Sequence, residues 1–142
     1  MSNSEAGAPD ILINVDVRDL EAGIAFYTNA LGLRVGRRFG DVGAELLGGT
    51  SSVYLLSKEE GSAAYRRDGA PRRSYSRHWT PVHLDFVTDD LEASVERACS
   101  AGATLEQPLS DHAWGRMAVL ADPFGNGFCI LQFNERGYDA LL

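Results

Sequence analysis

The sequence is poor in cysteine and in basic residues, and it has no long apolar run. Its 142 residues contain two cysteines, Cys99 and Cys129. These are too few for a disulfide framework and form no CxxC motif, so we expect two buried thiols in a reducing compartment. No apolar run approaches the roughly 18 residues that cross a bilayer, and we expect no membrane partner. The N-terminal MSNSEAGAPD lacks a basic start and an apolar signal core, which favours a cytoplasmic protein.

Positive charge is scarce and unevenly distributed. Thirteen Lys and Arg face twenty Asp and Glu, a net charge of −7, which argues against a nucleic-acid partner because such binding needs a basic face. Tyr65 to Arg77 nevertheless contains five arginines and one acid, Asp68. This run is either a solvated loop or a lid that meets an anionic ligand or an acidic neighbouring subunit.

The feature that organises the chain is an internal repeat. Ile11 to Gly32 and Val82 to Gly102 follow the same design, and each contains Asp-Leu-Glu-Ala, at Asp19–Ala22 and at Asp90–Ala93. Seven residues before each of these Asp residues the copies differ, with Leu12 in the first and His83 in the second. A length of 142 residues suits two small modules that share one core.

Each copy predicts a strand, a helix and three further strands. In the first, Asp19 is the expected N-cap and Gly32 the helix stop, with strands at Ile11 to Val17, Leu33 to Phe39, Gly43 to Leu47 and Ser52 to Ser57. In the second, Asp89 and Glu92 resemble a capping box and Gly102 ends the helix, with strands at Val82 to Val87, Thr104 to Gln107, Arg116 to Ala121 and Phe128 to Phe133. Asp122 to Gly127 predicts a turn.

The predicted fold class is therefore α+β, with two tandem βαβββ modules that form a curved mixed β-sheet cavity with the helices outside. The expected organisation is a tail at 1–9, a first module at 10–57, a linker or lid at 58–80, a second module at 81–134 and a C-terminal tail at 135–142. Alternation along the first strands places Ile13, Val15, Val17, Val82, Leu84 and Phe86 under the helices, and Leu12, Asn14, Asp16, His83, Asp85 and Val87 on the concave side.

These motifs resemble the vicinal oxygen chelate superfamily, which includes glyoxalase I, bleomycin-resistance proteins, extradiol dioxygenases and fosfomycin-resistance enzymes. The resemblance rests on V-x-V-x-D-L-x-x-x-I-x-F-Y-x-x-x-L-G-L at Val15 to Leu33, on its echo at Asp85 to Gly102, and on DPFGNGFCILQF at Asp122 to Phe133. It covers almost the whole chain apart from the tails and the central linker.

Metal-dependent members of that superfamily hold a divalent ion with four side chains, typically a His and a Glu from each module. Carried over by resemblance, these positions fall on Leu12, near Tyr54, on His83 and on Cys129. One of the four matches and Cys129 is a departure, and a His–Cys pair alone would hold a metal poorly. We therefore expect no cofactor; if a divalent metal binds, His83 and Cys129 would ligate it.

The residues expected to contact a ligand are His83, Asp85, Asn14, Tyr54, Trp114 and Cys129. Trp114 either stacks on a flat ligand or packs within its loop, close to His112. Glu45 is either an acid or base, or a solvent-facing strand residue. His78 and Trp79 end the linker, where they would cover the cavity mouth.

Two functions remain open. The first is a metal-independent protein that binds a small molecule, resembling the bleomycin-resistance branch, with an acidic charge suited to a cationic drug. The second is a metal-dependent lyase, isomerase or dioxygenase that uses His83 with Cys129 or Glu45 around a rearranged ligand set, or with His83 as a metal-free general base. The resemblance also implies a homodimer.

Overall fold

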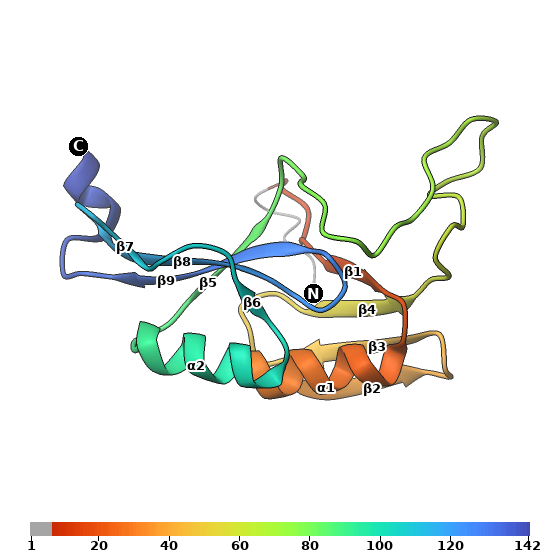
Figure 1. Cartoon of the computed structure of the whole chain (residues 1–142), viewed down its shortest axis with the longest axis horizontal. Helices are drawn as coiled ribbons and strands as arrows, with labels where there is room; N and C mark the ends of the chain where they lie inside the picture. The colour runs from red at the N-terminus through yellow and green to blue at the C-terminus, as the bar shows by residue number, and fades with distance from the viewer. Residues whose placement is uncertain (1–6) are drawn as a thin grey trace.

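The computed structural model describes residues 7–142, and the predicted tail at 1–9 lies mostly outside them. The described chain contains two α-helices, nine strands and one 3₁₀ helix (Figure 1). In chain order they are β1 (Ile13–Val17), α1 (Leu20–Leu31), β2 (Arg34–Phe39), β3 (Gly43–Leu47), β4 (Val53–Ser57), β5 (Leu84–Val87), α2 (Leu91–Ala101), β6 (Thr104–Leu105), β7 (Ser110–His112), β8 (Gly115–Ala121), β9 (Gly127–Phe133) and η1 (Gly137–Leu141).

The first module is a four-stranded mixed sheet in the order β1-β4-β3-β2, with β1 parallel to β4. Helix α1 begins where Asp19 accepts a hydrogen bond from the backbone N–H of Ala22 at 3.0 Å. It ends at Gly32, whose φ of 72° is a left-handed conformation that favours glycine. Both predicted helix ends are therefore confirmed.

The second module repeats this arrangement in the order β5-β9-β8-β6, with β7 also paired to β8. The predicted capping box at Asp89 and Glu92 is wrong. Asp90 caps α2, since it accepts from Ala93 N–H at 3.1 Å, whereas Glu92 pairs with Arg116. Strand β5 begins two residues later than predicted, at Leu84, which is the first residue that pairs with β9, opposite Phe128.

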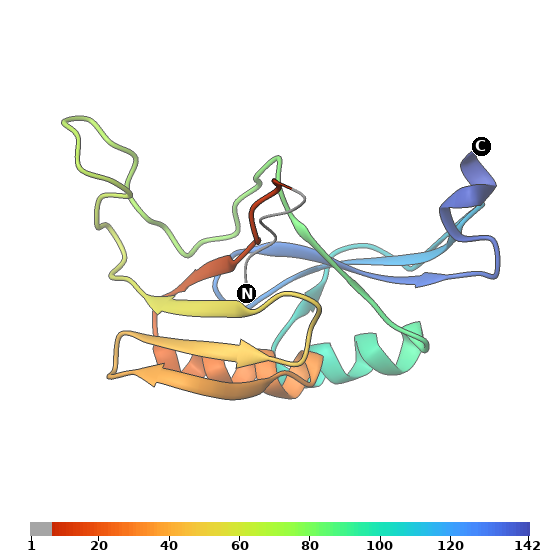
Figure 2. The same ribbon diagram turned by 180° about the vertical axis from the view of Figure 1, so that it is seen from behind.

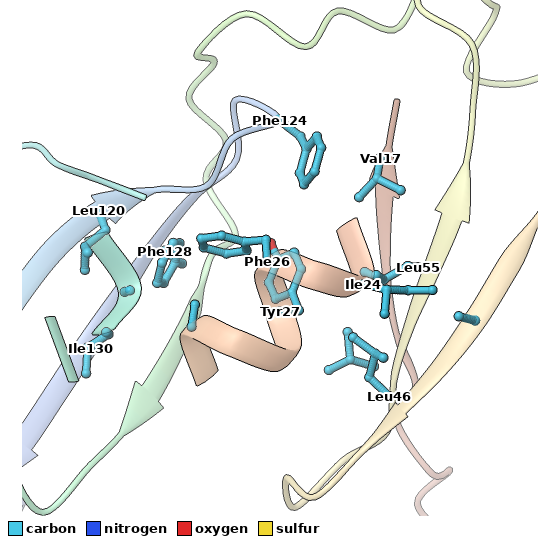
Figure 3. Packing of buried hydrophobic residues seen from close by; sticks show 14 of the residues in the cluster. Val17, Ile24, Phe26, Tyr27, Leu46, Leu55, Leu120, Phe124, Phe128 and Ile130 are labelled. Carbon is cyan, nitrogen blue, oxygen red and sulfur yellow. The ribbon is translucent and has the colours of Figure 1, made fainter. Parts of the chain in front are cut away.

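Both helices lie on the same side of the two sheets, as the two opposite views show (Figures 1 and 2). Their buried faces join one core that includes residues of both modules (Figure 3). Phe26 of α1 packs edge-on against Phe128 of β9, with ring centroids 6.3 Å apart. The predicted α+β class with two tandem modules is confirmed, and the second module adds the short strand β7, which was not predicted, to the βαβββ order.

The segments outside the modules have more structure than predicted. The linker carries a short hairpin closed by the Ala63–Arg72 bridge, and this hairpin protrudes near the first module (Figure 1). The C-terminal tail contains η1. Cys129 is buried as predicted, but Cys99 is exposed, because it lies on the outer face of α2, away from the buried Leu91, Val95 and Ala98. No helix in residues 7–142 is long and apolar enough to cross a membrane.

Candidate functional site

A cavity with a volume of about 800 Å³, larger than the others described below, lies between the modules. Strands β1 and β5 are both edge strands, and the cavity opens between their unpaired edges. Side chains from both faces of a strand therefore line it, for example Ile13 and Asn14 of β1. This corrects the predicted division of faces, in which only the concave set would meet a ligand. Val82 was also expected under a helix but is exposed.

The cavity wall combines an apolar interior with polar groups. The apolar side chains come from the first strands of both modules, from α1 and from β9, and they include Ile13, Val15, Tyr27, Leu84, Phe86 and Phe128. The polar side chains come from β1, the linker, the segment before β5 and the β8–β9 turn, and they include Asn14, Asp16, Arg72, Arg73, His78, His83 and Asn126. A few placed polar groups on an apolar wall are typical of small-molecule sites.

The linker forms one wall and is held there by ion pairs. Arg73 pairs with Asp16 of β1, with 2.7 Å between Nε and the carboxylate. Arg77 donates two hydrogen bonds to Glu106, at 2.6 and 2.9 Å, and this raises the pKa of Arg77 and lowers that of Glu106. The linker is thus tied to both modules.

The β8–β9 turn is a second anchor, centred on the buried carboxylate of Asp122. One oxygen accepts from the backbone N–H groups of Phe124 and Asn126, at 2.8 and 2.9 Å. The other accepts from the Tyr27 hydroxyl and from the Asn126 side-chain amide. Burial and the nearby carboxylate raise the pKa of Tyr27 well above its usual value, so its hydroxyl stays protonated and joins α1 to the second module.

His83, Asp85 and Cys129 lie together on the second sheet. Their ligand atoms are all within 4.8 Å of one another, and His83 Nε2 is 3.1 Å from the Asp85 carboxylate. Asp85 and Cys129 are register partners on β5 and β9. Burial, and then the neighbouring Asp85 carboxylate, raise the pKa of the Cys129 thiol to about 11. The free thiol is therefore protonated at neutral pH.

The equivalent face of the first sheet holds a closed network. Glu45 is 7% exposed and accepts from the Arg37 side chain at 2.8 Å and from the Tyr54 hydroxyl at 3.0 Å. The expectation that Glu45 faces solvent is wrong, because Arg37 of the edge strand β2 folds over it. The Arg37 hydrogen bonds hold the pKa of Glu45 at about 2, which leaves it ionised and unsuited to proton transfer near neutral pH.

The structure brings together some of the predicted site residues and separates others. Asn14 and His83 line the cavity between the modules. Cys129 lines a smaller one of about 170 Å³ with His83 and the exposed Trp79. Asp85 lines a third, of about 490 Å³, on the far side of Ile13, Leu84 and Phe86.

Tyr54 and Trp114 line none of these three cavities. The hydroxyl of Tyr54 is engaged by Glu45 and Arg37. Trp114 stacks on His112, with ring centroids 4.9 Å apart, and packs against Phe133 and Tyr138. Of the two interpretations of Trp114, packing within its loop describes its surroundings.

The sequence predicted a linker or lid whose end, at His78 and Trp79, would cover the cavity mouth, but it missed the part that the β8–β9 turn has in the cavity. Asn126 was assigned to turn formation alone, yet its side chain bonds Asp122 on one side and His78 on the other. Arg73 and Tyr27 were not singled out. The sequence does show an arginine-rich linker and an Asp in the first strand. No spacing rule, however, predicts an ion pair between residues 57 positions apart.

The four-ligand metal site of the superfamily does not fit these residues. Leu12 offers no donor atom, and the Tyr54 hydroxyl is committed to Glu45. What remains is the His83, Asp85 and Cys129 group, which includes a carboxylate outside the family's ligand positions. Imidazole, carboxylate and thiolate are all ligands of Zn²⁺, so this group could only support a rearranged site.

The fold and the match to a family model place the chain in the vicinal oxygen chelate superfamily. It belongs to the glyoxalase-like domain family, whose model matches residues 12–131. An uncharacterized protein from Mycobacterium bovis is 43% identical over 54 residues, which are 37% of this chain and 36% of that protein. The match thus spans about a third of that curated relative.

Solved structures with the same fold include both an antibiotic binder and a resistance protein. The fosfomycin resistance protein FosX from Listeria monocytogenes has a TM-score of 0.68 at 16% identity, covering 95% of this chain and 98% of that chain. TnmS3, an antibiotic binding protein from Streptomyces sp. CB03234, has a TM-score of 0.62 at 23% identity, covering 89% and 97%. These likenesses establish the fold alone.

Proposed function

We propose that this protein binds a largely apolar small molecule in the cavity between β1 and β5, without the metal site of its superfamily. The observation that carries the proposal is the cavity itself. Its volume of about 800 Å³ lies within the roughly 300–1,000 Å³ of ligand pockets, and most of its lining surface is apolar, with polar groups placed along it. The loss of donors at Leu12 and Tyr54 supports a metal-independent site.

A pair of matched variants tests this proposal. Leu12 lines the cavity and is 61% exposed, and Val42 in the β2–β3 turn is 60% exposed and lines none of the cavities described above. Leu12→Trp places an indole in the cavity, whereas Val42→Trp adds the same ring elsewhere. Calorimetry with flat aromatic antibiotics and cationic glycopeptides should show binding that Leu12→Trp weakens at least about tenfold. Absence of binding across the panel, or equal losses in both variants, would contradict the proposal.

The second candidate is an enzyme of the same superfamily, a lyase, isomerase or dioxygenase, with a rearranged metal site. The proximity of His83, Asp85 and Cys129 favours it. A divalent metal would polarise a substrate oxygen there. Because the free Cys129 thiol is protonated at neutral pH, metal uptake through its sulfur should release a proton.

Elemental analysis and a metal titration separate the two candidates. Stoichiometric Zn, Ni, Fe or Mn that is lost in His83→Ala, with proton release that is lost in Cys129→Ser, would support the enzyme. Protein that contains no metal after mild purification and takes up none on titration with Zn²⁺ would rule the rearranged site out. That result would agree with the proposed metal-independent binding of a small molecule.

We also propose that the protein is a two-fold dimer. Large apolar side chains are exposed on the second module and on the C-terminal tail, including Val87 and Leu141, both at 62%, and a partner would cover such residues. Light scattering should give twice the 15.4 kDa mass of the chain. The mass of a single chain at working concentration would contradict the dimer.

A further inference from the structure

We infer that the cavity between β1 and β5 selects organic anions: a largely apolar molecule with a carboxylate or sulfonate, held at the linker by Arg72 and His78. This inference rests on the proposed function and assigns the ligand class of the same site. It reverses the expectation that an acidic protein would suit a cationic drug.

The cavity wall has more basic than acidic side chains, whereas the whole chain has a negative net charge. The chain carries a net charge of −7. Its cavity is lined by two arginines, Arg72 and Arg73, by two histidines, His78 and His83, and by one carboxylate, Asp16. Local charges in a partly enclosed space, rather than net charge, set the potential that a ligand meets there.

The single carboxylate is already neutralised. Arg73 Nε lies 2.7 Å from Asp16, and Arg73 also donates to the Ser62 hydroxyl and the Ala63 carbonyl. Arg72 is different, because its guanidinium donates to the Gly61 carbonyl at 2.9 Å and forms no ion pair with any residue that the structure describes. Arg72 therefore keeps its charge for a ligand.

His78 lines the same wall, next to the β8–β9 turn. Its Nδ1 lies 2.9 Å from the Ser76 carbonyl oxygen, and its Nε2 lies 3.0 Å from Asn126 Oδ1. The Asn126 amide is oriented by its nitrogen, which donates to the Asp122 carboxylate. These contacts fix the His78 ring on the cavity wall, where neither ring nitrogen has a carboxylate partner among residues 7–142.

The chemistry of the ligand follows from these contacts. The wall offers one guanidinium without a carboxylate partner and one imidazole ring with neutral oxygen partners, beside apolar side chains of β1, β5 and β9. A carboxylate or sulfonate on a flat apolar body would pair with the guanidinium and lie beside the imidazole ring. His83 adds little, because Asp85 lies beside it at 3.1 Å.

Two dyes that differ mainly in one charge test the inference. 8-Anilinonaphthalene-1-sulfonate is an apolar anion, and N-phenyl-1-naphthylamine is its neutral counterpart without the sulfonate. Fluorescence titration of the full chain should give at least about fivefold tighter binding of the anion. Arg72→Gln should remove most of that preference. Arg66→Gln is the matched control, since Arg66 is in the same linker but lines a separate, more open pocket.

The outcomes distinguish failure of the inference from failure of the proposed function. If neither dye binds, or if Leu12→Trp leaves both affinities unchanged, the cavity is not the binding site. The proposed function and the inference are then both wrong. If the neutral dye, or the cationic dye proflavine, binds as tightly as the anion and Leu12→Trp weakens it, the site stands and the inference is wrong. Equal losses in Arg72→Gln and Arg66→Gln would indicate general surface attraction and would also overturn the inference.

Discussion

At the scale of single residues, Glu45 has surroundings that decide its chemistry. Four hydrogen bonds reach its carboxylate: one from the backbone N–H of Arg37, two from the Arg37 guanidinium and one from the Tyr54 hydroxyl. These hydrogen bonds lower its pKa from 4.5 to about 2. A catalytic acid or base works best with a pKa near the working pH, so Glu45 is a structural anion that fixes the edge strand β2.

Glu45→Gln should change how stability depends on pH. The folded-state pKa is depressed, so the contribution of Glu45 is complete above its ordinary value of 4.5 and is lost as the pH falls towards about 2. The Tm gap between the wild type and Glu45→Gln should be widest near neutral pH and should close in that acidic range. Thermal unfolding followed by circular dichroism measures it. Glu59→Gln, at an exposed carboxylate outside every ion pair of the described chain, should show no such closing gap; a constant gap for Glu45→Gln would refute the assignment.

At the scale of elements, the start of α2 has two neighbouring residues that could each be its N-cap. Asp89 and Asp90 both precede α2, and both could cap it from the sequence. In the structure Asp90 has the extended backbone of an N-cap and accepts from Ala93 N–H. Glu92 instead forms an ion pair with Arg116 of β8, so its carboxylate does not turn back to the start of the helix.

Replacing the two aspartates in turn tests the cap. Asp90→Ala should lower the free energy of unfolding by about 1 kcal/mol, since it leaves a helix N–H without a partner. Asp89→Ala should change it by less than about 0.5 kcal/mol. Urea unfolding at neutral pH compares the two. A larger loss for Asp89→Ala would return the cap to the position predicted from the sequence.

The linker and the β8–β9 turn form one unit through close backbone contact. A Cβ added at Gly125 would lie 2.3 Å from the Ser76 carbonyl oxygen, at a φ of +88°. Gly125→Ala should therefore push residues 74–80 off the turn and speed tryptic cleavage after Arg77. Gly40→Ala is the control, because Gly40 also has a positive φ, +60°, but a Cβ there would meet open space. Equal cleavage rates in the two variants would show that the contact does not hold the linker.

At the scale of the whole molecule, the two modules share one core and should unfold together. Phe26 of α1 is 2% exposed and contacts Phe128 of the second module (Figure 3). Tyr27, the next residue, bonds Asp122. Neither module keeps its buried face covered without the other, and a module of about 60 residues buries little surface alone.

Phe26→Ala tests this coupling. The substitution should cost about 3–5 kcal/mol, from lost burial and the cavity that it leaves. Both tryptophans, Trp79 and Trp114, lie outside the first module, so their fluorescence reports on the other part of the chain. Urea transitions followed by fluorescence and by far-ultraviolet circular dichroism should shift together. A fluorescence midpoint that stays in place would show that the modules unfold independently.

The sequence by itself determined the repeat, the order of both helices and of every strand except the short β7, and the fold class. Those features depend on local signals: alternation in strands, apolar spacing in helices, a capping Asp and a stopping Gly, all within a few residues of one another. Even the local signals led to the wrong cap, Asp89 in place of Asp90, since both have the same side chain.

The tertiary structure alone decided where a ligand could bind. The cavity depends on how far β1 lies from β5 and on where residues 58–80 cross them, and no local pattern encodes either distance. Tyr54 and Trp114 were expected to contact a ligand. In the structure the Tyr54 hydroxyl bonds the Arg37–Glu45 pair, and Trp114 packs in an aromatic cluster. Arg72, His78 and Asn126 became cavity residues only because folding brings the linker onto a turn some 48 positions away.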